Sequence, residues 1–222
     1  YQHFKGYHIK SESPVFTPNQ FTMMDFRLSY KNSTSFTYIL PFSENEALIE
    51  YTFFTPYLTE ETIYDEQLKK YISEYLKLDT YEILNEEQGI IPMTDFPFEK
   101  DNSAKITKIG TGGGWVKAST GYSFKHTEKK ISKIIKNIKS GHKPSKDLFL
   151  RKYKFYDAIF LDVLARRNDK GEQIFSKFYQ KNSVEEIFAY LDEETPFNED
   201  LKIMFSLFDP EFIISFFRKF RL

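Results

Sequence analysis

The spacing of apolar residues changes once along this chain, and that change constrains the fold more than any other feature. Before residue 93, short runs of alternating apolar and polar residues are separated by Ser, Pro and Asn, as in strands and turns. After Gly110, apolar residues recur three and four positions apart, as in helices. This order predicts an α+β fold, with a mixed or antiparallel sheet from the first part and an α-helical C-terminal portion.

The first part predicts several strands and one helix. The segments 36–42 and 46–54 flank the turn Ser43-Glu44-Asn45, which indicates a hairpin. A helix is expected from a cap at Thr59 to about Leu78. The other expected strands are 3–10, 20–28, 80–93 and 104–109.

The second part predicts helices that start or break near five residues: Ser145, Asn168, Ser183, Pro196 and Asp209. In the first helix, an isoleucine stripe is expected to be buried: Ile131, Ile134, Ile135 and Ile138. The opposite side is expected to be solvated: Lys129, Lys130, Lys133, Lys136 and Lys139. We therefore divide the chain into a β-rich part, residues 1–125, and a helical part, residues 126–222.

The last helix, residues 212–222, leaves two alternatives open. Its apolar side packs on the domain, or it rests on a membrane surface with the basic residues beside it. The apolar side comprises Phe212, Ile213, Phe216, Phe217 and Phe220. The basic residues are Arg218, Lys219 and Arg221.

Composition excludes several classes of function. The net charge of −1 removes the usual electrostatic argument for nucleic acid. The chain has no cysteine, which excludes disulfides and thiolate chemistry. Aromatic residues make up 18% of the chain, with 24 Phe and 15 Tyr. They form either a large aromatic core or an apolar cavity that tolerates positive charge.

Glu50 is the candidate catalytic residue. On the strand 46–54 it shares a face with Leu48 and Thr52, and that face is not polar throughout. A carboxyl among apolar groups keeps its proton, because burial disfavours the charged form, and it can then act as a general acid. The alternative is a solvent-facing glutamate on a half-exposed strand.

A glycine-rich loop at residues 110–121 is the candidate cofactor-binding segment. Its glycines allow the backbone to approach a ligand, and Ser119 and Thr120 are expected to cap the following helix. The spacing fits neither a P-loop nor a dinucleotide fingerprint, and a tight structural turn is the alternative. The candidate residues are Gly110, Gly112, Gly113, Gly114, Lys117, Ser119, Thr120 and Gly121. The histidines (His3, His8, His126 and His142) lack a ligand spacing, so we interpret them as isolated surface residues and expect no metal site.

A series of segments in shared order closely resembles the bacterial lycopene β-cyclases. It covers residues 1–125 and continues more weakly into the helical part. The segments are Met24-Asp-Phe26, Phe36-Thr-Tyr-Ile-Leu-Pro-Phe42, Leu48-Ile-Glu-Tyr-Thr52, Glu86-Glu-Gln-Gly-Ile-Ile-Pro-Met93 and residues 109–124.

The resemblance implies an FAD-dependent, hydroxylase-like flavoprotein that isomerises lycopene, with reduced FAD recharged by NAD(P)H. It places the essential acid at Glu50 and the flavin-facing loop at residues 110–121. Two positions depart from the family: Tyr51 replaces a second acid, which puts a supporting carboxylate in doubt, and Ala118 stands where many members have Pro.

The family's dinucleotide-binding unit has no counterpart in this chain. We therefore expect a fragment that binds FAD poorly and is inactive alone, so stoichiometric yellow protein would contradict this. We expect a cytoplasmic protein, with peripheral contact at the inner membrane surface as an open alternative. The rival functions are another flavin enzyme of the same fold and a non-catalytic module that binds an apolar ligand.

Overall fold

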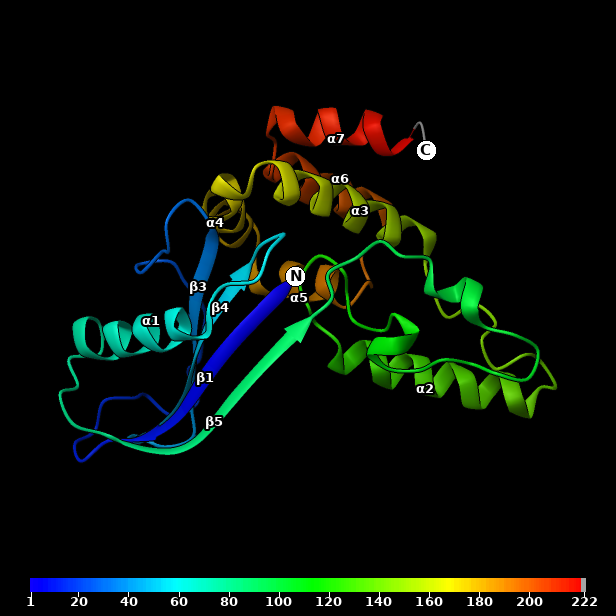
Figure 1. The fold of residues 1–222 in the computed structure, drawn as a ribbon. Coiled ribbons are helices and arrows are strands. Elements are labelled where there is room, and N and C mark those ends of the chain that lie inside the picture. Colours follow the sequence, from blue (N-terminus) through cyan, green and yellow to red (C-terminus); the bar gives the residue numbers. More distant parts are fainter. Residues whose placement is uncertain (221–222) are drawn as a thin grey trace. The chain divides into compact units, whose positions relative to one another are not determined.

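The computed structural model describes residues 1–220, and within them an α+β fold with five strands and seven α-helices (Figure 1). The chain forms two compact units. Unit 1 contains Tyr1–Ile91 and Asn168–Glu172, and unit 2 contains Pro92–Arg167 and the segment from Gln173 onward. Each unit is described by itself.

Unit 1 is built on a five-stranded sheet in which all neighbouring strands are antiparallel. The strand order is β2-β3-β4-β1-β5. The bounds are β1 Gln2–Lys10, β2 Thr22–Asp25, β3 Thr34–Pro41, β4 Glu46–Phe54 and β5 Glu82–Ile91. The predicted β3–β4 hairpin is therefore present, and β5 ends immediately before Pro92, which has no N–H to continue the ladder.

The helix α1 (Glu61–Glu74) covers one face of this sheet and closes the core of unit 1. Leu68, Tyr71 and Ile72 on α1 are fully buried. They belong to the same apolar cluster as Ile49 and Phe53, which alternate along β4 toward this face. The other face of the sheet therefore carries the remaining alternate residues of each strand, including Glu50.

Three details of the predicted elements in this region were wrong. Thr59 does not cap α1: the N-cap is Glu60, without a side-chain cap, and the helix ends at Glu74. The segment 20–28 is a strand only at Thr22–Asp25, because Arg27 bends back to pair with the Asp25 carboxylate at 2.5 Å. Residues 104–109 form no strand.

Unit 2 is helical and begins with an irregular segment that contains the glycine-rich loop. Its α-helices are α2 (Phe124–Lys139), α3 (Arg151–Arg166), α4 (Gly171–Lys181, whose first residues belong to unit 1), α5 (Val184–Leu191), α6 (Phe197–Ser206) and α7 (Pro210–Phe220). The predicted cap at Ser183 is a capping box with Glu186. Residues 92–125 belong to unit 2 together with these helices, the first of which begins at Phe124.

The expected orientation of α2 was wrong. Ile131, Ile135 and Ile138 are exposed, whereas Lys130 and Asn137 are buried. Polar anchoring explains the difference, because the Asn137 side chain donates to the backbone oxygens of Pro144 and Lys146 at 3.0 and 2.8 Å. These bonds hold residues 144–146 as a turn, so the next helix begins at Arg151 and not near Ser145.

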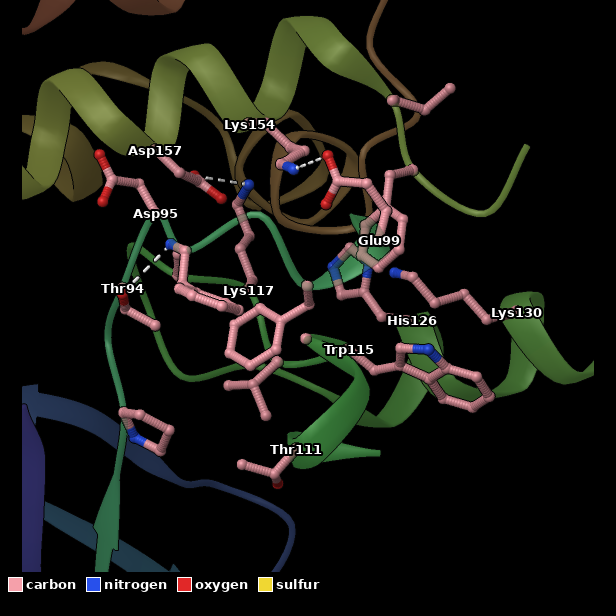
Figure 2. A pocket seen from close by; sticks show the side chains of 18 of the residues that line it. Thr94, Asp95, Glu99, Thr111, Trp115, Lys117, His126, Lys130, Lys154 and Asp157 are labelled. Atoms are coloured by element: carbon pink, nitrogen blue, oxygen red, sulfur yellow. Dashed lines mark hydrogen bonds and ion pairs between the residues drawn. The ribbon is translucent and has the colours of Figure 1, made fainter. Parts of the chain in front are cut away.

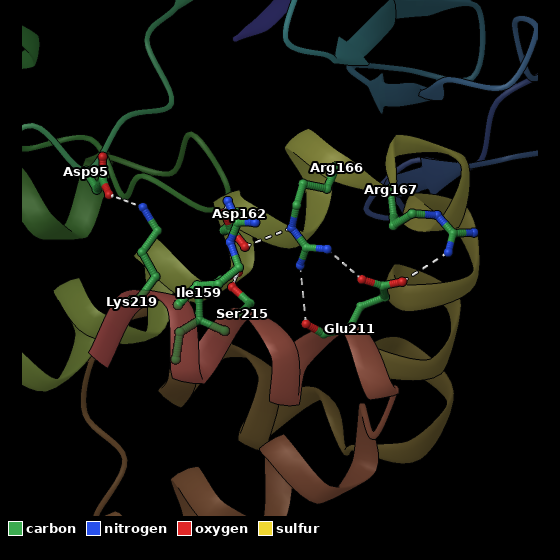
Figure 3. Close-up of polar contacts among 9 residues, drawn as sticks. Asp95, Ile159, Asp162, Arg166, Arg167, Glu211, Ser215 and Lys219 are labelled. Atoms are coloured by element: carbon green, nitrogen blue, oxygen red, sulfur yellow. Dashed lines mark hydrogen bonds and ion pairs between the residues drawn. The ribbon is translucent and has the colours of Figure 1, made fainter. Parts of the chain in front are cut away.

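Polar contacts also fix α7 against α3 (Figure 3). The Ser215 hydroxyl donates to the Ile159 carbonyl at 2.9 Å, and the Glu211 carboxylate binds Arg166 at 2.7 Å and Arg167 at 3.1 Å. The apolar side of α7 is only partly covered by the rest of unit 2. Its packing on the domain, one of the two alternatives from the sequence, is therefore incomplete. Arg221 lies outside the described residues, and none of the described helices has the length and apolarity to cross a membrane.

Candidate active site

Glu50 lies at the centre of the sheet, on the face opposite α1. Its Cα pairs with that of Tyr38 on β3 and with that of Gly6 on β1. Gly6 pairs in turn with Glu87 on β5. Because directly paired residues project to the same face, these four positions form one row across four strands.

The environment of Glu50 disfavours the ionised form of its carboxyl group. Its pKa is raised from 4.5 to about 7. Burial is the main cause, since it disfavours the charged form, and the negative charge of Glu87 adds to it. The Thr52 hydroxyl donates to Glu50 Oε1 at 2.6 Å and acts in the opposite direction.

Aromatic rings and a small hollow lie around this acid. Tyr38 is its direct neighbour on β3, and Phe36 and Phe4 pair with Thr52 in the next row. On the side of Glu50 away from Thr52, the row that contains Leu48 borders a hollow of about 110 Å³. The hollow is lined by His8, Phe42, Leu48, Asn85, Glu86 and Glu87. The arrangement combines a proton donor, apolar surface and rings that stabilise positive charge.

Tyr51 cannot serve as a second acid beside Glu50, because adjacent residues on a strand face opposite ways. Its ring is fully buried in the core, and its hydroxyl bonds to the Leu28 carbonyl and the Ser35 hydroxyl, both at 3.1 Å. The Met24-Asp25-Phe26 segment is also structural, since the Tyr71 hydroxyl donates to Asp25 Oδ2 at 2.5 Å.

The glycine-rich loop in unit 2 is a tight turn with one open side. Thr111–Gly113 form a single 3₁₀ turn, and Gly110, Gly114 and Gly121 have positive φ angles. A Cβ on Gly113 would lie 2.4 Å from the Lys108 carbonyl oxygen, and one on Gly114 would lie 2.5 Å from the Phe98 ring. A Cβ on Gly110 or Gly112 would meet nothing within 4 Å. The backbone at Gly110 and Gly112 is therefore open to a ligand.

The polar residues that follow the loop are used inside unit 2 (Figure 2). Lys117 is buried, and its ammonium binds Asp157 at 2.9 Å and Glu193 at 3.4 Å. Burial alone would lower the pKa of Lys117, but these carboxylates outweigh it and raise the pKa. The Ser119 hydroxyl donates to Asp157 at 2.7 Å.

Lys117, Asp157 and Glu193 border a pocket of about 60 Å³ that Gly114 and Trp115 also line. Neither Ser119 nor Thr120 caps the next helix, whose N-cap is Ser123.

Two of the four histidines are buried, so their interpretation as surface residues was wrong. His3 bonds to Thr55 Oγ1 at 2.8 Å and to the Tyr64 hydroxyl, and burial lowers its pKa to about 4. His126 Nε2 bonds to the Leu191 carbonyl at 2.8 Å. Within residues 1–220, no group of His, Asp or Glu is arranged to hold a metal ion.

Sequence reasoning missed Gly6, Tyr38 and Glu87 as neighbours of Glu50. Glu87 lies in one of the segments that we quoted, but its pairing opposite Gly6 depends on strand register. The register of β1 with β5 contains an irregularity at His8/Ile9, and no local sequence signal revealed that position.

The fold and this site define a class: an α+β protein with a carboxyl group of raised pKa on the face of an antiparallel sheet that lies opposite α1. The chain belongs to the family described as lycopene cyclase protein, whose profile matches residues 1–219. Membership supports carotenoid cyclisation in general and a carotenoid as the substrate. A search of curated proteins found none similar to this chain.

Proposed function

We propose that this chain is the substrate-binding and catalytic part of a lycopene β-cyclase, with Glu50 as the acid. The observation that carries the proposal is the position of this carboxyl, which lies between the rows of Leu48 and Thr52 with Tyr38 as its direct neighbour, where burial raises its pKa to about 7. Its position beside Tyr38, on the sheet face opposite α1, suits an apolar polyene.

The reaction is an isomerisation, so it returns the proton that it takes. Glu50 gives its proton to the terminal double bond of lycopene, which leaves a tertiary carbocation and a carboxylate. The next double bond attacks the cation and closes a six-membered ring, and transfer of a ring proton to the Glu50 carboxylate gives the β-ring and restores the acid. The aromatic side chains exclude water, which would trap the cation, and their faces stabilise its charge.

The open side of the glycine-rich loop fits a planar cofactor such as FAD. Gly110 and Gly112 would hold it through close backbone contact, because neither position has side-chain or backbone atoms in the way. Lys117 would act indirectly, by fixing the loop to Asp157 and Glu193. Reduced FAD, recharged by NAD(P)H, would supply electron density that stabilises the cation, or the proton itself.

Residues of α7 contact the membrane from which the substrate is taken. Phe217 and Phe220 are 57% and 71% exposed, which is unusual for phenylalanine. Beside them α3, α6 and α7 line an apolar groove of about 450 Å³. An acyl chain or a polyene fits such a groove, and Arg218 on the same helix favours anionic lipid.

Vesicle binding tests this contact. Replacing Phe217 and Phe220 with Glu should reduce sedimentation with anionic liposomes several-fold, because two charges would enter the acyl boundary. The matched control replaces Phe21 and Tyr57 in unit 1 with Glu, because their side chains are 57% and 52% exposed and the change of charge is the same. Equal sedimentation of both variants would contradict the assignment to α7.

Expression of the full-length gene product in lycopene-accumulating cells tests the function itself. The proposal expects pigments with β-rings by chromatography. Oxygen uptake with NAD(P)H that is coupled to an oxidised pigment would indicate another flavin enzyme of this fold. Retention of lycopene without conversion would indicate a binding module.

A further inference from the structure

Gly6 separates two carboxyl groups on the sheet face opposite α1. It pairs with Glu50 on one side and with Glu87 on the other. A Cβ at Gly6 would lie 3.1 Å from Glu87 Cγ and 3.4 Å from Glu87 Oε1, so the Glu87 side chain lies over the glycine. The absence of a side chain at Gly6 therefore lets Glu87 extend toward Glu50.

We propose that Glu87 is the positioning partner of Glu50, and that the two carboxyl groups share one proton across Gly6. The inference rests on the proposed function of Glu50 and deepens it. It also accounts for Tyr51: that position points into the core, so the second carboxyl comes from β5 and not from the neighbouring residue of β4.

The geometry suits a carboxyl–carboxylate pair. Two like charges at close range cannot both ionise freely, so one group stays protonated and donates a hydrogen bond to the other. A hydrogen bond to Glu87 and its negative charge both act to raise the pKa of Glu50. Thr52 donates to Glu50 Oε1 and so helps to fix the orientation of the carboxyl.

The proton balance of ring closure fits this pair. Glu50 gives one proton to the double bond, and the ring later loses one proton, so the pair regains its starting charge after each turnover. Glu87 touches the substrate in neither step. Its role is to keep Glu50 protonated and oriented.

Other groups on this face do not substitute for Glu87. Tyr38 faces Glu50 from β3, and Asn85 on β5 is uncharged. One row away on β1, His8 bonds through Nε2 to Glu46 Oε1 at 2.7 Å, and Glu46 lies two rows from Glu50 on β4. Of the carboxyl groups of Glu46 and Glu87 on this face, that of Glu87 is therefore the one that reaches Glu50.

The test is Glu87→Gln in the full-length protein, with Glu82→Gln as the matched control. Glu82 lies on the same strand, its loss changes the net charge equally, and it pairs with Lys10, two rows away from Gly6. The Glu50 carboxyl is followed by NMR in protein labelled with ¹³C at glutamate Cδ, and Glu50→Gln identifies its signal.

We expect the Glu50 titration to move to lower pH by roughly one unit in Glu87→Gln and to stay in place in Glu82→Gln. Cyclisation should follow, with the alkaline limb of its pH profile shifted equally and activity at pH 7.5 reduced several-fold. Gly6→Ala, whose Cβ would press on both Glu87 and Leu48 while both carboxyls are kept, should have the same direction of effect.

If the pKa of Glu50 in Glu87→Gln equals that in the wild type, the proposal that the two carboxyl groups share a proton is wrong, whatever reaction the enzyme catalyses. A moved titration with an unshifted pH profile would overturn the role of the pair in the reaction. A wild-type protein that titrates as expected but forms no rings would instead refute the proposed function, so the two failures are distinguishable.

Discussion

At the scale of single residues, the features that make Glu50 an acid also make it unfavourable for stability. The folded state holds its proton with a pKa of about 7 against an ordinary value of 4.5. The folded state therefore binds more protons than the unfolded state between these values, so stability falls as pH rises through this window. Below about pH 4.5 the carboxyl is neutral in both states, and the penalty vanishes.

Glu50→Gln should remove this penalty, because glutamine is neutral and can still accept the hydrogen bond from Thr52. We expect the variant to match the wild type near pH 4 and to be more stable at pH 8 by up to about 3 kcal/mol. Urea denaturation at both pH values measures this, with the exposed Glu12→Gln as control. The same stability difference at pH 4 and pH 8 would contradict the assigned burial of the carboxyl.

At the scale of elements, the glycine-rich loop contains two kinds of glycine. Some are required by the fold of the loop, and others have open space where a side chain would lie. Gly113 and Gly114 are required by the loop's own packing against Lys108 and Phe98. Gly110 requires glycine because of its positive φ, whereas Gly112 has neither a positive φ nor a close neighbour. Nothing in the described residues explains a glycine at position 112, which is why it is the informative site for a ligand.

Gly112→Ala and Gly113→Ala should therefore behave differently in the full-length protein. Gly113→Ala should destabilise unit 2 by about 1–3 kcal/mol, because the Lys108 backbone cannot move aside. Gly112→Ala should change stability by less than about 0.5 kcal/mol but lower the flavin content. Thermal unfolding and flavin absorbance of the purified variants measure both. Full flavin content in Gly112→Ala would contradict a close approach at this position.

Local sequence patterns predicted most of these strands and helices. They did not predict which side of each helix is buried. The strand 46–54, the hairpin before it and the cap at Ser183 all depend on neighbouring residues, and all are present. The burial of α2 was predicted from isoleucine spacing and failed, because Asn137 bonds to carbonyls that only the tertiary fold brings within reach.

Glu50 could be predicted because a motif and strand alternation both concern nearby residues. The position of Glu87 across Gly6 from Glu50 could not be predicted, because it depends on the register of β4, β1 and β5.

At the scale of the whole molecule, the aromatic residues lie in different environments in the two units. Phe53 is fully buried in the core of unit 1, and Phe36 is fully buried on the opposite face of the sheet. In unit 2, Phe208, Phe217 and Phe220 are exposed, and Phe208 and Phe217 line the apolar groove. Under the proposed function, this exposed surface of unit 2 would contact an apolar substrate or a membrane.

The most direct test of the central claim is ring formation by Glu50→Gln in the full-length protein. Glu46→Gln is the control, since it lies on the same strand and face, two rows away. Pigments from lycopene-accumulating cells and the flavin content of each purified variant are measured together. We predict that Glu50→Gln retains flavin and leaves lycopene uncyclised, while Glu46→Gln forms β-rings; wild-type amounts of β-rings from Glu50→Gln would remove this residue from the mechanism.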